Sequence, residues 1–240
     1  MNQGYHQFGI SALERMAEAP SFNRWMYECI QPFVTGDSIE IGSGIGNISA
    51  FFAAAGQPIT LTDTDESEVD VLKQRFATYP NVRDILQMNI ASPDFTKKYA
   101  HLAGSFDSVF LLNVLEHIED DSLAVQHCRF LLKAGGTLLI LVPAYKILFS
   151  KMDELLGHYR RYTAASLRTV ITQNGFKIEK SFYFNALGMA GWWWNKIFGK
   201  AEISSGKMAL FNRLVPVAKY IDKLCFNKWG LSTIVAAKKN

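Results

Sequence analysis

The chain has 240 residues, of which 49% are hydrophobic and 20% are charged, and its formal net charge is +3. These proportions are typical of a globular protein and disfavour a disordered chain or a coiled coil. The small positive charge, without a polybasic run, gives no reason to expect a nucleic-acid partner. The three cysteines, Cys29, Cys128 and Cys225, form no C-x-x-C pair. Their spacing disfavours a zinc ribbon or a disulfide framework and suits a reducing cytoplasm.

The first residues, Met1 to His6, lack the basic start and apolar core of a secretory signal. The sequence also has no uninterrupted apolar stretch of the ~20 residues that a membrane-spanning helix needs. We therefore expect a cytoplasmic protein.

Helical and β-branched stretches alternate along most of the chain. After apolar residues at helical spacing in 11–34, we expect strands at 38–41, 58–62, 82–88, 106–112 and 137–142, with helices at 47–55, 66–78 and 122–132. Residues 133–136 are expected to form a turn before the fifth strand, and Pro143 to end that strand. A helix at 164–174 and strands at 176–184 and 231–237 follow. Alternation of helices with fully apolar strands predicts a mostly parallel sheet covered on both faces.

A glycine-rich loop, Glu40-Ile41-Gly42-Ser43-Gly44-Ile45-Gly46-Asn47, follows the first strand and opens a helix. Glycines let the backbone turn tightly and approach a ligand closely. A tight turn without a ligand would use the same glycines. However, the G-x-G-x-G spacing differs from the G-x-G-x-x-G of dinucleotide folds, and Glu40 would repel a pyrophosphate. An ammonium group would be favoured beside Glu40 instead.

An acidic residue, Asp63, stands at the end of the second strand, 21 residues after Gly42. A carboxylate about 20 residues past the first glycine can accept both hydroxyls of a ribose. We prefer Asp63 for this role, because Asp65 is placed to cap the helix that begins near Glu66.

In this order, the motifs resemble those of the class I S-adenosylmethionine-dependent methyltransferases, and most closely the subgroup called methyltransferase type 11 or 12. The resemblance runs from about residue 20 to 185. It rests on the loop Glu40–Gly46, on Asp63, on Met88-Asn89-Ile90, on Phe106-Asp107-Ser108-Val109, on Asn113-Val114-Leu115-Glu116-His117 and on Leu132-Lys133-Ala134-Gly135-Gly136-Thr137. Two positions depart from the family pattern: Asn89 stands where many members have Asp, and Ala134 replaces the usual Pro.

The resemblance implies an α/β fold, doubly wound, with a mostly parallel seven-stranded Rossmann-like sheet and helices on both faces. It implies one domain over residues 1–240, with an N-terminal helical lid (1–35), a cofactor-binding core (36–185) and a Trp-rich insertion (186–229) before the last strand. It also implies S-adenosyl-L-methionine as cofactor. The expected cofactor-binding residues are Glu40, Gly42, Ser43, Gly44, Gly46, Asn47, Asp63, Thr64, Asn89, Ile90, Asn113 and Val114.

Two histidines are candidate general bases. His117 follows Glu116 beyond the fourth strand, at the sheet edge where open α/β sheets bind ligands, and His158 lies after the fifth strand. Alternatively, His117 only caps or orients the next helix. Some resembling quinone O-methyltransferases place a metal by such a Glu-His pair, but the sequence shows no further convincing ligand, so we expect no metal.

Arg160, Arg161 and Tyr162 follow His158, at a position from which the resembling family builds substrate pockets. The arginines could hold a carboxylate or phosphate of the substrate. They could equally form internal ion pairs with Asp153 and Glu154.

The segment 186–229 contains Trp192-Trp193-Trp194 together with several lysines. Trp and Lys together are typical of the membrane–water interface. Three interpretations stay open: a wall or lid of the acceptor pocket, in which Trp193 contacts the substrate, a peripheral membrane contact, or a homodimer patch.

The sequence therefore predicts an S-adenosylmethionine-dependent methyltransferase that acts on oxygen or nitrogen of a small or lipid-like acceptor. A nucleotide-dependent oxidoreductase is disfavoured by the glycine spacing and by Glu40. A non-catalytic cofactor-binding module would carry the same motifs. A nucleic-acid methyltransferase is disfavoured because the chain lacks an Asn/Asp-Pro-Pro-Tyr/Phe motif and a strongly basic face.

Overall fold

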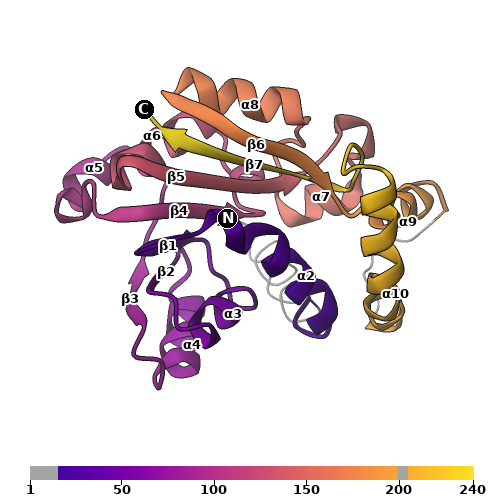
Figure 1. The fold of residues 1–240 in the computed structure, drawn as a ribbon, viewed down its shortest axis with the longest axis horizontal. Helices are drawn as coiled ribbons and strands as arrows, with labels where there is room; N and C mark the ends of the chain where they lie inside the picture. Colours follow the sequence, from indigo (N-terminus) through magenta and orange to yellow (C-terminus); the bar gives the residue numbers. More distant parts are fainter. Residues whose placement is uncertain (1–15, 199–204) are drawn as a thin grey trace.

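A seven-stranded sheet forms the centre of the computed structural model, which describes residues 16–198 and 205–240 (Figure 1). Residues 1–15 of the predicted lid lie outside the described residues. The strand order is β3-β2-β1-β4-β5-β7-β6. The strands are β1 (Ser38–Ile41), β2 (Ile59–Asp63), β3 (Val82–Gln87), β4 (Phe106–Leu112), β5 (Leu132–Pro143), β6 (Phe176–Phe184) and β7 (Ser232–Lys239). β7 is antiparallel to both β5 and β6, and the other pairs are parallel. The predicted fold class is confirmed.

Helices cover both faces of this sheet. They are α2 (Pro20–Ile30), α3 (Ser49–Ala54), α4 (Glu66–Phe76), α5 (Phe95–Lys98), α6 (Asp121–Leu131), α7 (Lys151–Leu156), α8 (Ala164–Gln173), α9 (Ala186–Phe198) and α10 (Ser205–Leu224). Short 3₁₀ turns follow α2 (Gln31–Phe33), α5 (Ala100–Leu102), β4 (η3, Leu115–His117) and β5 (η4, Lys146–Leu148).

Alternate residues of the central strands build two separate cores. On β4, Val109 and Leu111 pack with side chains of α5, α6 and α8, whereas Phe110 and Leu112 pack with side chains of α2, α3, α4 and α10. Because successive strand residues point to opposite faces, a strand buried on both faces is apolar at every position. This explains the apolar run 109–112 in β4, which follows the polar residues Asp107 and Ser108.

The region before the fifth strand differs from the prediction of a separate turn. Residues 133–136 belong to β5, which begins at Leu132. Phe106 pairs with Leu132, but Ser108 already pairs with Thr137, so four residues of β5 stand opposite the single residue Asp107 of β4 and form a bulge. Gly135, with φ +72°, lies within the bulge. The glycines indicated a chain reversal, whereas they accommodate a bulge inside a continuous strand.

The insertion 186–229 contains the helices α9 and α10, which pack against each other, and α10 also packs against α2. At its base, the Asp222 carboxylate accepts backbone N–H groups of Asn185 (2.7 Å) and Ala186 (2.8 Å), which ties the end of α10 to the start of α9. Among the described residues, none of the helices is long and apolar enough to span a membrane.

Candidate active site

The glycine loop after β1 has a backbone that only glycine adopts easily. Gly42, Gly44 and Gly46 have φ values of +72°, +52° and +78°. A Cβ atom on Gly42 would lie 2.5 Å from Val114 Cγ2, and one on Gly46 would lie 2.5 Å from the Phe76 ring. The loop therefore needs glycine both for its φ angles and for close packing. The contact with Val114 also shows that the loops after β1 and β4 meet at the sheet edge.

Asp63 at the end of β2 is held beside this loop. Its Oδ2 accepts the Gly44 N–H (2.8 Å) and its Oδ1 accepts the Asp65 N–H (3.1 Å), and the side chain stays half-exposed. Asp65 accepts the Ser67 N–H at the first turn of α4, which confirms its predicted capping role. The neighbouring Thr64 is exposed. Asp63 is thus oriented toward the glycine loop, with part of its carboxylate open to a ligand.

Glu40 lies beneath the loop, with only 3% of its surface exposed. Its carboxylate accepts the Ser49 hydroxyl at the start of α3. Burial raises the pKa of Glu40 to about 8, although hydrogen bonds from Ser49 and Ser43 oppose the shift. A cationic ligand group near this carboxyl would favour its ionised form. Direct contact of Glu40 with an ammonium stays a prediction.

Other predicted cofactor residues line up along the same edge. The buried Ser43 donates its N–H to the Thr62 carbonyl (2.7 Å). Arg75 of α4 donates to the Ile45 carbonyl (2.5 Å) and reaches Asn47 Oδ1 at 3.5 Å. These bonds fasten the glycine loop to the strand beside it and to the helix after β2.

The residues after β3 and β4 are placed differently from one another. Asn89 is exposed and accepts the Ala91 N–H at Oδ1 (2.9 Å). The side chain of Ile90 is 2% exposed and belongs to the core, so its contact with an adenine would come from the backbone. Asn113 has φ +54°, which asparagine tolerates better than most residues, and its N–H donates to the Leu141 carbonyl (2.8 Å).

The two candidate bases lie side by side, which the sequence did not reveal. The rings of His117 and His158 are 4.5 Å apart, centroid to centroid, and nearly perpendicular at 87°. His158 Nδ1 lies 2.9 Å from Asp153 Oδ1. The His117 side chain keeps an exposed part, but partial desolvation of its ring and the nearby His158 lower its pKa to about 4. His117 is therefore neutral at pH 7.

Glu116 is fully buried behind these histidines. Within the described part of the chain, neither carboxylate oxygen of Glu116 has a hydrogen-bond partner. Burial raises its pKa to about 8. Ligand atoms of Glu116, His117 and His158 all lie within 4.8 Å of one another, so these three groups could hold a metal ion. Sequence reasoning missed His158 as the third group, because the fold brings it to the Glu-His pair from 41 residues away in the chain. The metal-free site stays a prediction.

The predicted substrate-binding arginines have internal partners. Arg161 is buried and pairs with Asp153 through Nε (2.7 Å) and Nη2 (3.2 Å), as one of the two sequence alternatives expected. Arg160 pairs with Asp121 of α6 (3.0 Å) rather than with Glu154. Asp121 also accepts the hydroxyl of the buried Tyr162 (2.8 Å). These contacts fix the loop between α7 and α8, and a substrate role for its residues stays a prediction.

Trp192 of α9 contacts this region, whereas the substrate contact of Trp193 stays a prediction. Its Nε1–H donates to the Leu148 carbonyl (3.1 Å), and the Arg161 guanidinium carbon lies 4.6 Å from its ring centroid. Trp193 lies on α9 with 44% of its surface exposed. The sequence pattern alone could not tell which of these rings packs against Arg161.

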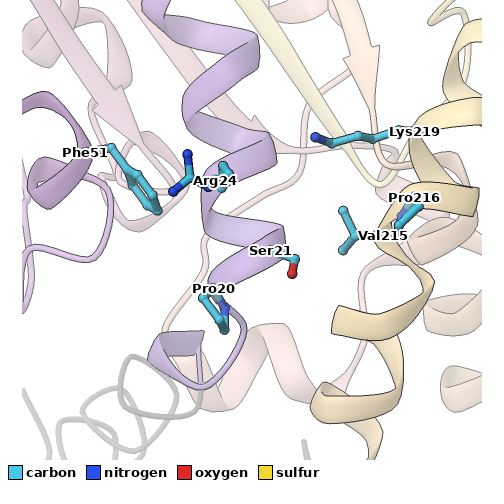
Figure 2. A pocket seen from close by; sticks show the side chains of 7 residues that line it. All are labelled: Pro20, Ser21, Arg24, Phe51, Val215, Pro216 and Lys219. Carbon is cyan, nitrogen blue, oxygen red and sulfur yellow. The ribbon is translucent and has the colours of Figure 1, made fainter. Parts of the chain in front are cut away.

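A hollow of about 360 Å³ lies between α2, α3 and α10 (Figure 2). It is lined by Pro20, Ser21, Arg24, Phe51, Val215, Pro216 and Lys219. Figure 2 shows Arg24 of α2 beside Phe51 of α3, with the α10 side chains opposite. None of the predicted site residues lines this hollow, so it is distinct from the candidate site at the sheet edge.

Hydrogen bonds join the ends of β1, β2 and β3 to one another and the loops after β4 and β5 to one another, and the packing of Gly42 against Val114 links the two groups. Gly44 is bonded to Asp63, Met88 N–H to the Asp63 carbonyl (2.8 Å), and Tyr159 N–H to the Glu116 carbonyl (2.8 Å). In open α/β sheets, ligands bind outside the carboxyl ends of the strands, at the point where the strand order reverses. Here the order reverses between β1 and β4. Fold and edge together define an α/β protein of the class that binds its ligand at this edge.

Comparison with known proteins agrees with this class. Residues 39–138 match the family model described as a methyltransferase domain. A probable S-adenosylmethionine-dependent methyltransferase of Mycolicibacterium smegmatis is 31% identical over 161 residues, which are 64% of this chain and 57% of that protein. A ubiquinone biosynthesis O-methyltransferase of Xanthomonas campestris is 29% identical over 42% of this chain and 41% of its own. The chain thus spans between about two fifths and little more than half of the length of the curated relatives it matches.

Solved structures share the fold at low sequence identity. A possible histamine N-methyltransferase of Thermotoga maritima superposes with a TM-score of 0.64 at 14% identity, over all of both chains. Phosphoethanolamine N-methyltransferase 2 of Haemonchus contortus, solved with S-adenosyl-L-methionine, gives 0.61 at 19% identity, over 90% of this chain and 52% of that one. The matches of sequence support a class I S-adenosylmethionine-dependent methyltransferase family for the region that they cover. S-adenosyl-L-methionine is the cofactor of that family.

Proposed function

We propose that the protein transfers a methyl group from S-adenosylmethionine to an oxygen or nitrogen of a small or lipid-like acceptor. The observation that carries this proposal is the meeting of two groups of residues at one sheet edge. The glycine loop packs against Val114, and the His117–His158 pair begins three residues further along the chain. The residues expected to bind the cofactor and the candidate general bases are therefore neighbours.

The residues at the edge fit the cofactor. S-adenosylmethionine, when bound, supplies a methyl group activated by a sulfonium. Asp63 would accept the ribose hydroxyls, and Asn89 would pair with the adenine edge. The glycine loop would cover the methionine end, where the buried acid Glu40 favours a nearby cation.

We assign proton removal to His158. Its Nδ1 is engaged by Asp153, so its Nε2 can accept a proton from the acceptor. Burial by itself would raise the pKa of Asp153, but hydrogen bonds from His158 and Arg161 lower it to about 2. The ionised Asp153 orients the ring through its contact with Nδ1. Alignment of the acceptor supplies part of the rate, and a positioned base adds roughly 10²–10⁴-fold.

The names of similar proteins support both oxygen and nitrogen as the methyl-accepting atom. One relative is named as an O-methyltransferase of ubiquinone biosynthesis, and one structural neighbour as a phosphoethanolamine N-methyltransferase. Both names point to small or lipid-related acceptors, which is the basis for that part of the proposal. The three cysteines are free thiols, which fits the proposed cytoplasmic location.

Calorimetric titration with S-adenosylhomocysteine tests the cofactor site. We expect micromolar binding by the wild type, severe weakening by Asp63→Ala, and unchanged binding by Glu66→Gln, which alters an exposed acid at the start of α4. Absence of binding by the folded wild type would contradict the proposal. Binding of NAD in its place would favour the oxidoreductase class.

Substitution of the histidine pair tests turnover. We expect His158→Gln to lower kcat by about 10²-fold or more while S-adenosylhomocysteine binding stays intact, with a similar loss for Asp153→Asn at neutral pH. His101→Gln, on an exposed turn after α5, is the control. Cofactor binding without turnover of any acceptor would instead support a non-catalytic module.

A further inference from the structure

Helix α10 has two apolar faces, of which only one is used for packing in the described structure. Val215 and Ala218 are buried against the core shared with α2. Leu210, Leu214, Val217 and Leu224 recur at i, i+4, i+7 and i+14, so they share another face of the helix. Their exposed fractions run from 38% to 60%. A helix in water normally places polar residues on its outward face.

Exposed aromatic side chains lie on the same pair of helices. Trp193 (44% exposed) and Trp194 (68% exposed) lie on α9, which packs against α10, and Tyr220 (63% exposed) lies on α10 itself. Trp and Tyr favour a boundary where one part of the ring is apolar and the other part is hydrated. We call these three aromatics and the four residues of the α10 stripe the α9–α10 surface.

The segment 186–229 carries a net positive charge. Residues 186–229 contain seven Lys and Arg against two Asp and Glu, whereas the remainder of the chain contains 18 against 20. Asp222, one of the two acids, is 2% exposed and caps backbone N–H groups. The exposed charged side chains described in this segment are therefore cations, such as Arg213 and Lys223. The net positive charge of the molecule therefore comes from this segment, since the remainder of the chain is slightly negative.

The α9–α10 surface is joined to the candidate active site. Trp192 donates to the Leu148 carbonyl and packs under Arg161, whose partner Asp153 holds His158. Lys196 donates to the carbonyl of Ile147 (2.5 Å), and the Ile147 side chain is 65% exposed. Whatever covers the α9–α10 surface therefore stands beside the loop that carries the candidate base.

We propose that the α9–α10 surface docks on an anionic lipid bilayer, so that a lipid-like acceptor reaches the site from the membrane. Exposed apolar and aromatic side chains beside cations match an interface of acyl chains and anionic headgroups. A second copy of the chain fits less well, because two segments that each carry a net charge of +5 would repel each other. The statement about the acceptor rests on the proposed function, whereas the docking itself does not.

Vesicle co-sedimentation of the full chain tests the docking. We expect binding to phosphatidylcholine vesicles that contain phosphatidylglycerol, little binding to phosphatidylcholine alone, and loss of binding at high salt. The double variant Leu214→Glu/Val217→Glu should abolish binding. Val71→Glu, which alters an exposed apolar residue of α4 (41% exposed), should leave it unchanged. Arg213→Gln should weaken binding roughly fivefold, the effect of about one basic residue near an anionic surface.

Two further readouts separate the explanations. Sedimentation velocity without lipid should show a monomer; a dimer that dissociates in Leu214→Glu/Val217→Glu would overturn the proposal in favour of a second copy. S-adenosylhomocysteine binding should be equal in that variant and the wild type, which shows that the variant is folded. Failure of vesicle binding with intact cofactor binding would refute the docking alone, whereas vesicle binding without cofactor binding would refute the proposed function alone.

Discussion

At the scale of single residues, Glu116 is a buried acid of the candidate site whose carboxyl group lacks hydrogen-bond partners among the described residues. Its pKa is raised from 4.5 to about 8. Because the folded-state pKa is the higher one, the unfolded chain binds fewer protons between these two values. The free energy of unfolding should therefore fall as the pH rises from about 4.5 to about 8, by roughly 1.4 kcal/mol per pH unit for this group.

The substitution Glu116→Gln should remove this contribution. Urea unfolding between pH 5 and pH 8 should show a smaller decrease of stability in the variant than in the wild type. Part of the decrease should remain, because the pKa of Glu40 is raised in the same direction. Glu119→Gln, at a neighbouring exposed position, is the control and should keep the wild-type slope.

A bound cation is the alternative way to satisfy Glu116. We expect a proton instead, because the raised pKa keeps the carboxyl neutral at pH 7. Thermal unfolding with added Mg²⁺, Mn²⁺ or Zn²⁺ should then show no change in Tm. A stabilisation by one of these ions that disappears in His158→Gln, but persists in His101→Gln, would contradict the metal-free prediction and assign Glu116, His117 and His158 as ligands.

At the scale of elements, a comparison of Gly46 with Gly56 distinguishes the cost of a left-handed backbone from the cost of a steric clash. Gly46 has φ +78° and would place a Cβ 2.5 Å from the Phe76 ring, whereas Gly56 has φ +74° with nothing within 4 Å. Gly56→Ala should cost about 1–2 kcal/mol of unfolding free energy from the left-handed backbone alone. Gly46→Ala should cost about 1–3 kcal/mol more, because α4 must move away.

Cofactor affinity should separate the same two variants. Gly46 belongs to the loop that joins β1 to α3, so we expect Gly46→Ala to weaken S-adenosylhomocysteine binding and Gly56→Ala to leave it unchanged. Calorimetry on both proteins at a temperature where each is folded gives the comparison. Equal affinities would mean that the loop tolerates a shift of α4 and does not contact the cofactor closely.

The elements that were predicted correctly carry their information locally. β4 ends in the apolar run 109–112, the glycine loop repeats a fixed spacing, and Asp65 stands where the helix after β2 begins. The histidine pair could not be predicted, because its approach depends on how the loop after β5 folds back against η3. The bulge in β5 was also missed, since a Gly-Gly pair indicates a turn and a bulge equally well.

At the scale of the whole molecule, the chain enters and leaves the insertion at neighbouring positions of the sheet. β6 and β7 are antiparallel neighbours, and Phe184 at the end of β6 pairs with Ser232 at the start of β7. The chain leaves the sheet after the first of these residues and returns at the second. In many antiparallel pairs a two-residue turn closes such a gap. The helices α9 and α10 are therefore an addition to a sheet whose strand pairing is complete without them.

This architecture predicts the outcome of replacing residues 185–231 by an Asn-Gly turn. The shortened protein should still bind S-adenosylhomocysteine with an affinity close to that of the full chain, because the loops after β1, β2 and β4 are untouched. It should be less stable by several kcal/mol, since Val215 and Ala218 no longer cover Trp25 and Phe184. It should also lose vesicle binding. A folded shortened protein that fails to bind S-adenosylhomocysteine would show that α9 and α10 complete the cofactor site. The assignment of cofactor binding to the sheet edge alone would then be wrong.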